Sequence, residues 1–139
     1  MKYLLILLFV IVYTLSYSQN KKWKFIHEKD RLEVLKVSFS ITGVVKKCYR
    51  YLDGDFVIDL KLDSCDFLLN KYNYSKLGGL LEVEIVCEHK GMFIECLNYV
   101  NDVKIPKVGD HIRIWGDYVC DKRHQWCEIH PVTLLEFLH

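Results

Sequence analysis

Histidine and carboxylate side chains are concentrated in one short segment near the C-terminal end of the chain. The segment contains Asp121, His124, Glu128 and His130. Alternate side chains of an extended strand point to the same side, so Glu128 and His130 are expected to share a face with Trp126. An imidazole beside a carboxylate can act as a general acid/base pair, and it can also bind zinc with one position left open.

Three interpretations of this segment follow. In a small metal-dependent hydrolase, His124, Glu128 and His130 would be the catalytic group. In a zinc site, the ligands would be Asp121, His124 and His130, and Asp59 and His111 on outward faces of other strands could join them. The simplest interpretation is structural: Glu128 and His130 would hydrogen-bond the turn and the backbone near Pro131, without a metal or cofactor.

Aromatic residues offer a second kind of site. Trp115, Tyr118 and Trp126 are expected on neighbouring strands. Aromatic side chains on the face of a small barrel can stack on sugars or bases, which makes these three candidate binding residues. The alternative is ordinary packing in the core and at strand edges.

Strong period-two alternation indicates the elements that must position these residues. Strands are predicted over residues 35–46, 56–63, 81–88, 111–118 and 126–135, with Leu35 and Val37 among the inward side chains of the first. Pro131 should place an edge or a bulge in the last strand. A short helix is expected over residues 66–70, and another within the long connection of residues 89–105.

Five strands, an antiparallel start and one long connection predict an all-β fold with a minor helix. The arrangement that fits best is a small five-stranded Greek-key barrel of the OB-fold kind. A β-sandwich is the alternative.

The six cysteines are Cys48, Cys65, Cys87, Cys96, Cys120 and Cys127. An even number of cysteines in an exported domain suggests three disulfides. Cys87 with Cys96, and Cys120 with Cys127, can each close a short local loop. Cys48 and Cys65 would pair by elimination, although the hairpin register argues against their direct contact.

The N-terminus has the order of a secretory signal peptide. Lys2 precedes an apolar run from Tyr3 to Leu15, and the small residues Ser16 and Ser18 follow it. Cleavage after Ser18 would leave a secreted or otherwise extracytoplasmic protein, periplasmic or at the cell surface. An uncleaved leader would instead tether it to a membrane. The predicted organisation is a leader at 1–18, an N-terminal extension at 19–33 and a barrel domain at 34–139.

Charge argues against nucleic acid as a partner. The chain has 19 basic and 18 acidic side chains, and the leader removes Lys2, so the mature domain is formally neutral. Phosphate backbones are bound by clustered lysines and arginines. The one such cluster, from Lys21 to Lys24, is interpreted as a solvated tail. The partner is expected to be an unknown extracellular ligand, namely an oligosaccharide, a peptide or a protein. Asn73 opens a glycosylation sequon if the host is eukaryotic.

Several segments together resemble a known family. They are Asp53–Leu60, Leu81–Cys87 with Cys96, Ile105–Asp110, Gly116–Val119 and His124–Val132, and the last contains the pattern W-x-E-I-H-P. In these segments the chain resembles an uncharacterised family of secreted OB-fold-like proteins of microbes. The resemblance implies the barrel fold and export, and it brings no activity. Cys120 and Cys127 depart from the family's pattern, as an added local crosslink would.

Overall fold

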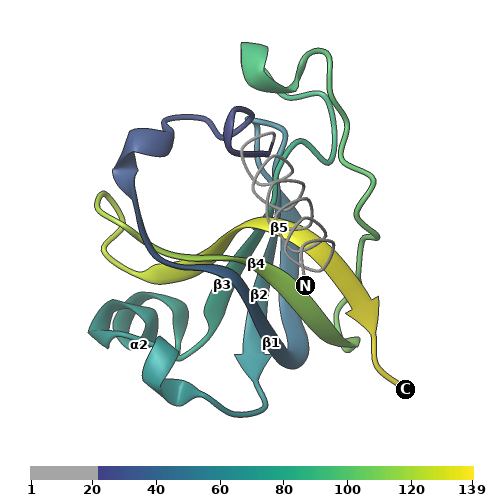
Figure 1. Ribbon diagram of the computed structural model, residues 1–139. Coiled ribbons are helices and arrows are strands. Elements are labelled where there is room, and N and C mark those ends of the chain that lie inside the picture. Colours follow the sequence, from purple (N-terminus) through teal and green to yellow (C-terminus); the bar gives the residue numbers. More distant parts are fainter. Residues whose placement is uncertain (1–21) are drawn as a thin grey trace, which may run out of the picture.

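The computed structural model describes residues 22–139 (Figure 1). The predicted leader lies outside this range. The elements in chain order are η1 (Lys29–Arg31), β1 (Leu32–Arg50), β2 (Phe56–Leu62), η2 (Asp66–Leu68), α2 (Lys71–Leu77), β3 (Leu81–Ile85), η3 (Ile94–Cys96), β4 (His111–Asp121) and β5 (Cys127–Phe137). Across residues 22–139, no helix has the length and apolar character needed to cross a membrane.

The five strands form a closed barrel in the order β1-β2-β3-β5-β4. Long β1 closes it, because its first part pairs with β4 and its second part with β2. All pairs are antiparallel except the one between β3 and β5, which is parallel. The predicted small five-stranded all-β barrel is therefore confirmed, and the alternative of two packed sheets is not adopted.

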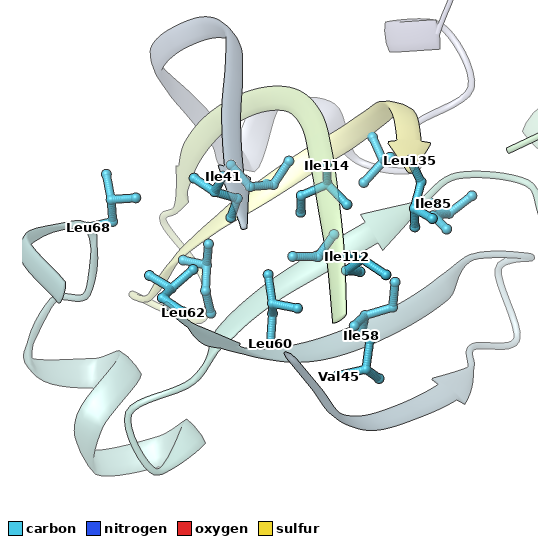
Figure 2. Close-up of a cluster of buried hydrophobic side chains, with 14 of the residues drawn as sticks. Ile41, Val45, Ile58, Leu60, Leu62, Leu68, Ile85, Ile112, Ile114 and Leu135 are labelled. Carbon is cyan, nitrogen blue, oxygen red and sulfur yellow. The ribbon is translucent and has the colours of Figure 1, made fainter. Parts of the chain in front are cut away.

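The barrel interior is filled by the inward side chains that the alternation predicts. Figure 2 shows them converging from the strands around the barrel, among them Ile41, Val45, Ile58, Leu60, Ile85, Ile112, Ile114 and Leu135. Gly43 lies where β1 passes from its β4 partner to its β2 partner. A Cβ on Gly43 would lie 2.8 Å from Cγ of Leu60 and would press on the carbonyl oxygen of Lys61, so only glycine fits this closely approached position.

The first part of β1 departs from the predicted alternation. Leu35 and Val37 were expected to point inward, but both are exposed. Register shifts occur between Val34 and Lys36 and between Lys36 and Phe39, and Ser38 has a left-handed backbone with φ of 50°. Such bulges insert residues without a partner and turn the following side chains to the other face. The prediction for Leu35 and Val37 is therefore wrong, and regular alternation resumes at Phe39.

The short helix predicted over residues 66–70 begins as the 3-10 turn η2 and continues further along the chain as α2. Helix α2 lies between β2 and β3, beside the turn that joins β4 to β5 (Figure 1). Asn70 caps it by accepting hydrogen bonds from the backbone N–H groups of Tyr72 and Asn73. The connection of residues 89–105 has only the single 3-10 turn η3. Backbone hydrogen bonds from Met92 to Leu52 and from Asn101 to Cys87 hold this connection against the barrel in an irregular path.

Two predicted disulfides are confirmed, and the third is not formed. Cys87 is bonded to Cys96, and Cys120 to Cys127. Cys48 and Cys65 are free thiols. Cys48 pairs with Ile58 near the β1–β2 turn, whereas Cys65 lies beyond the far end of β2, so the hairpin register keeps the two sulfur atoms apart.

Strand β5 contains the irregularity predicted at Pro131. Val132 pairs with Gly116 and Ile129 pairs with Tyr118, with register shifts between these pairs. His130 and Pro131 therefore lie in a bulged part of the ladder, as expected for a proline that cannot donate a hydrogen bond. A residue of this bulge can aim its side chain away from the regular pleat.

The segment before β1 packs on the outside of the barrel. Lys22 donates to the carbonyl oxygens of Val132 and Thr133, and the indole N–H of Trp23 donates to Asp117 at 2.6 Å. Ile26 is buried in a second apolar cluster that includes Val86 and Val119. The interpretation of Lys21 to Lys24 as a solvated tail is thus wrong for Lys22, while Lys21 lies outside the described residues.

Candidate functional site

Acidic side chains cross three adjacent strands on the outer face of the barrel. The register pairs Asp59 of β2 with Glu82 of β3, and Glu82 in turn with Glu128 of β5. Because alternate residues share a face, Glu84 and His130 join them. We call the closely spaced group formed by Asp55, Glu82, Glu84, Glu128 and His130 the acidic cluster.

The acidic cluster is buried although it faces outward. Glu82 is 1% exposed, Glu84 3% and Glu128 0%. The indole N–H of Trp126 is shared between Glu82, at 3.2 Å, and Glu128, at 2.9 Å. The hydroxyl of Tyr49 donates to the other oxygen of Glu82 at 3.2 Å. Two aromatic side chains thus cover the carboxylates and supply them with donors.

His130 lies at the centre of the acidic cluster. Its Nδ1 is 3.1 Å from Oε2 of Glu84 and 3.1 Å from Oε1 of Glu128. Its Nε2 is 3.9 Å from Oδ2 of Asp55, which is longer than a hydrogen bond. This Nε2 is buried and has no hydrogen-bond partner among the described residues. Such an unpaired buried polar atom needs an explanation, and an ion is one of the usual ones.

Burial and neighbouring negative charges raise the pKa of three carboxyl groups of the acidic cluster, Asp55, Glu82 and Glu84. Burial raises the pKa of Glu82 to about 7, and the neighbouring Glu128 adds to the effect. Burial raises the pKa of Asp55 to about 6, against the opposing influence of His130. The pKa of Glu84 lies well above its ordinary value, again through burial first and Glu128 second. Without a cation, Asp55, Glu82 and Glu84 therefore hold their protons to higher pH than exposed carboxyl groups do.

A pocket of about 210 Å³ opens over the acidic cluster, and Glu84 belongs to its lining. The segment before β1 contributes His27 and Arg31, and the β4–β5 turn contributes His124. Arg31 is paired with Asp121, a buried carboxylate that also lies 2.9 Å from Nδ1 of His124. The pocket is thus polar, and it brings a small ligand to Glu84, the member of the acidic cluster in its lining.

The residues predicted from the C-terminal segment divide into two groups. Glu128 and His130 lie together. The structural interpretation expected them to hydrogen-bond the turn and the backbone near Pro131. Instead, His130 contacts Glu128 and Glu84. Asp121 and His124 pair with each other, with His124 in the pocket lining, and burial lowers the pKa of His124. The groups whose potential ligand atoms lie within 4.8 Å of one another include His130 but neither Asp121 nor His124.

The other candidates are dispersed. Asp59 is buried beside the acidic cluster and accepts from the hydroxyl of Tyr49 at 3.4 Å. His111 is exposed and pairs with Asp63 at 2.7 Å, away from the acidic cluster. Tyr118 packs against the core and donates to the carbonyl oxygen of Leu68.

The two tryptophans do not form one aromatic surface. Trp115 pairs with Leu134, whereas Trp126 comes just before the Cys120–Cys127 pair at the other end of the β4–β5 ladder. Trp126 stacks on His124 with ring centroids 4.5 Å apart. A stacking platform made jointly by Trp115 and Trp126 is therefore not available.

The glycosylation sequon falls in an inaccessible place. Asn73 is fully buried in α2, and its Nδ2 donates to the carbonyl oxygens of Cys127 and Leu80. A glycan on this nitrogen would break both bonds and has no room in the folded domain.

Sequence reasoning missed Asp55, Glu82 and Glu84 as site residues. Three groups of described residues have potential ligand atoms within 4.8 Å of one another: Asp55 with the disulfide-bonded Cys87 and Cys96, Asp55 with Glu84 and His130, and Glu82 with Glu84 and Glu128. The available signal was the pair of glutamates two residues apart on β3, which matches the spacing of Glu128 and His130 on β5. Carboxylates with one imidazole can bind hard or borderline divalent cations, and they can exchange protons.

Comparisons of the chain with protein-family models, with curated proteins and with solved structures find no match.

Proposed function

We propose that the protein is a secreted, disulfide-stabilised OB-like binding module that takes up a small cationic ligand over the acidic cluster. The observation that carries this proposal is the imbalance of buried charge. Carboxylates of Asp55, Glu84 and Glu128 surround the imidazole of His130, and Glu82 lies next to them. Unpaired buried charges are costly, so this group must hold either protons or a cation.

The pocket supports ligand access. Glu84 belongs both to the acidic cluster and to the pocket lining, so a ligand in the pocket can contact a carboxylate that is otherwise closed off from solvent. In this buried setting, charge attraction is stronger than in water. Arg31 and Arg123 also line the pocket, so the proposed ligand is a compact cation that reaches Glu84 itself.

Export is supported by the leader pattern and by the two disulfides, which persist in oxidising compartments. The cleaved form would begin at Gln19. Intact-mass measurement of exported protein tests this, and a mass that retains residues 1–18 would favour the membrane-tethered alternative.

The binding proposal is tested by calorimetry at neutral pH with a panel of cations: Zn²⁺, Mn²⁺, Ca²⁺, methylammonium and spermidine. We expect at least one cation to bind the wild-type protein, and Glu84→Gln to weaken that binding at least about tenfold by removing a buried charge. Glu136→Gln is the matched control, because Glu136 is exposed on the same β5 strand. If no cation binds, or if Glu84→Gln binds as well as wild type, the proposal is rejected.

A further inference from the structure

We propose that the cation is a divalent transition-metal ion, bound by Asp55, Glu84 and His130. This inference rests on the proposed function and deepens it by naming the ligand and the atoms that hold it. The three side chains come from the loop before β2, from β3 and from β5, so the closed barrel brings them together from distant parts of the sequence.

The spacing of the three side chains suits one ion. Their potential ligand atoms all lie within 4.8 Å of one another. The closest approach of Asp55 to His130 is 3.9 Å, between Oδ2 and Nε2. Zinc bonds to nitrogen and to carboxylate oxygen are about 2.0–2.2 Å long, so a single ion between these two atoms can contact both.

The hydrogen bonding of the His130 ring is a second observation that points to a metal ligand. Its Nδ1 lies 3.1 Å from carboxylate oxygens of both Glu128 and Glu84, and in the tautomer protonated at Nδ1 the ring donates to Glu128. In that tautomer the lone pair is on Nε2, which is buried without a hydrogen-bond partner among the described residues and lies 3.9 Å from Oδ2 of Asp55. Metal-binding histidines typically donate their other ring N–H to a carboxylate in this way.

Glu128 and Glu82 are assigned supporting roles. Both accept from the indole N–H of Trp126, and Glu82 also accepts from the hydroxyl of Tyr49. These bonds fix the two carboxylates as acceptors beside the proposed ligands. Glu128 is thus a positioning residue, which orients His130 without itself binding the ion.

The ligand set indicates the kind of metal. Two carboxylates with one imidazole suit zinc or manganese better than a purely oxygen-bound ion such as calcium. Three protein ligands leave a coordination position open, and Glu84 belongs to the lining of the pocket. We infer that the open position faces this pocket, where water or a small anionic group would complete the coordination.

The test is titration of the full mature chain with Zn²⁺ and with Mn²⁺ after chelation and dialysis, followed by calorimetry and elemental analysis. We expect one ion per chain. Asp55→Asn and His130→Gln should each weaken binding at least about tenfold, and Glu128→Gln about 10–100-fold. His111→Gln should bind as wild type, because His111 is an exposed histidine paired with Asp63.

A second measurement needs no variant at the site. Long-range ¹H–¹⁵N NMR of the wild-type protein should show the Nε2 resonance of His130, and not its Nδ1 resonance, shift on adding one equivalent of Zn²⁺. The inference is overturned if Nε2 is unchanged at saturating zinc, or if His130→Gln binds zinc as well as wild type. Binding of an organic cation without any metal would overturn this inference alone, whereas the absence of all cation binding would overturn the proposed function with it.

Discussion

The imidazole of His130 and the carboxylate of Glu128 lie 3.1 Å apart on alternate positions of β5, and both are closed off from solvent. A pair of this kind, next to further buried carboxylates, is shielded from water, so charges near it interact more strongly than charges near an exposed pair. The stability of the metal-free protein is therefore informative about the acidic cluster.

In the presence of a chelator, the free energy of unfolding should fall between about pH 5 and pH 8. The pKa of Asp55 is raised to about 6 and that of Glu82 to about 7, whereas both groups titrate near 4 in an unfolded chain. The folded state thus holds more protons in this window. The stability that these two groups contribute is present in full below about pH 4 and is lost as the pH rises through 6 and 7.

Urea unfolding at several pH values measures the slope of the free energy of unfolding against pH. His124 acts in the opposite direction, because burial lowers its pKa. The decisive quantity is therefore the difference between wild type and Glu82→Gln, in which one of the raised carboxyl groups is gone. A slope that is the same in both proteins would contradict the prediction.

The Cys120–Cys127 disulfide should contribute about 2–3 kcal/mol to stability, as expected for the short loop that it closes. The double variant Cys120→Ser/Cys127→Ser should lose this amount in urea unfolding. Cys65→Ser is the control, since Cys65 is a free thiol. Equal stability of the double variant and the control would show that the crosslink has no stabilising effect.

Gly43→Ala should destabilise the barrel by about 1–3 kcal/mol, the usual cost of overpacking. The added Cβ would meet the side chain of Leu60 and the carbonyl oxygen of Lys61, which is backbone and cannot move aside without disturbing the β1–β2 pairing. Gly109→Ala is not a matched control because of its positive φ, so Ser40→Ala on the exposed side of β1 serves instead. Thermal melts that coincide for both variants would refute this account of Gly43.

Period-two alternation predicts most of the barrel and assigns Glu82, Glu84 and Glu128 to its outer face. It does not predict that this face is buried, because alternation says nothing about what covers a face. The cover comes from Trp126 and from other long-range contacts. Likewise, the bulge at Ser38 depends on how β1 must bend between its two partners, and no local residue pattern indicates it.

The disulfides show the same difference between local contacts, which the sequence predicts, and long-range contacts, which it does not. Cys87–Cys96 and Cys120–Cys127 close local loops, so their spacing along the chain is sufficient to predict them. The acidic cluster joins residues from the loop before β2, from β3 and from β5, and its assembly depends on strand register. Glu82 meets Glu128 only because β3 and β5 pair in parallel, a feature that hydrophobic alternation cannot specify.

Trp126→Phe should lower the free energy of unfolding by removing a hydrogen-bond donor from the acidic cluster. The indole N–H is the donor that Glu82 and Glu128 share, and phenylalanine keeps an aromatic ring next to His124 while removing that donor. Leaving a buried acceptor unsatisfied costs about 1–3 kcal/mol, so the variant should lose stability by that amount in urea.

The same substitution should also raise the pKa of Glu82 further, because its ionised form loses a hydrogen bond. The fall in stability with pH should then extend to higher pH in Trp126→Phe than in wild type. Trp115→Phe is the control, since Trp115 pairs with Leu134 away from the acidic cluster. If the two variants lose the same stability and keep the same pH profile, Trp126 only fills space, and the hydrogen bonds assigned to its indole contribute nothing to the acidic cluster.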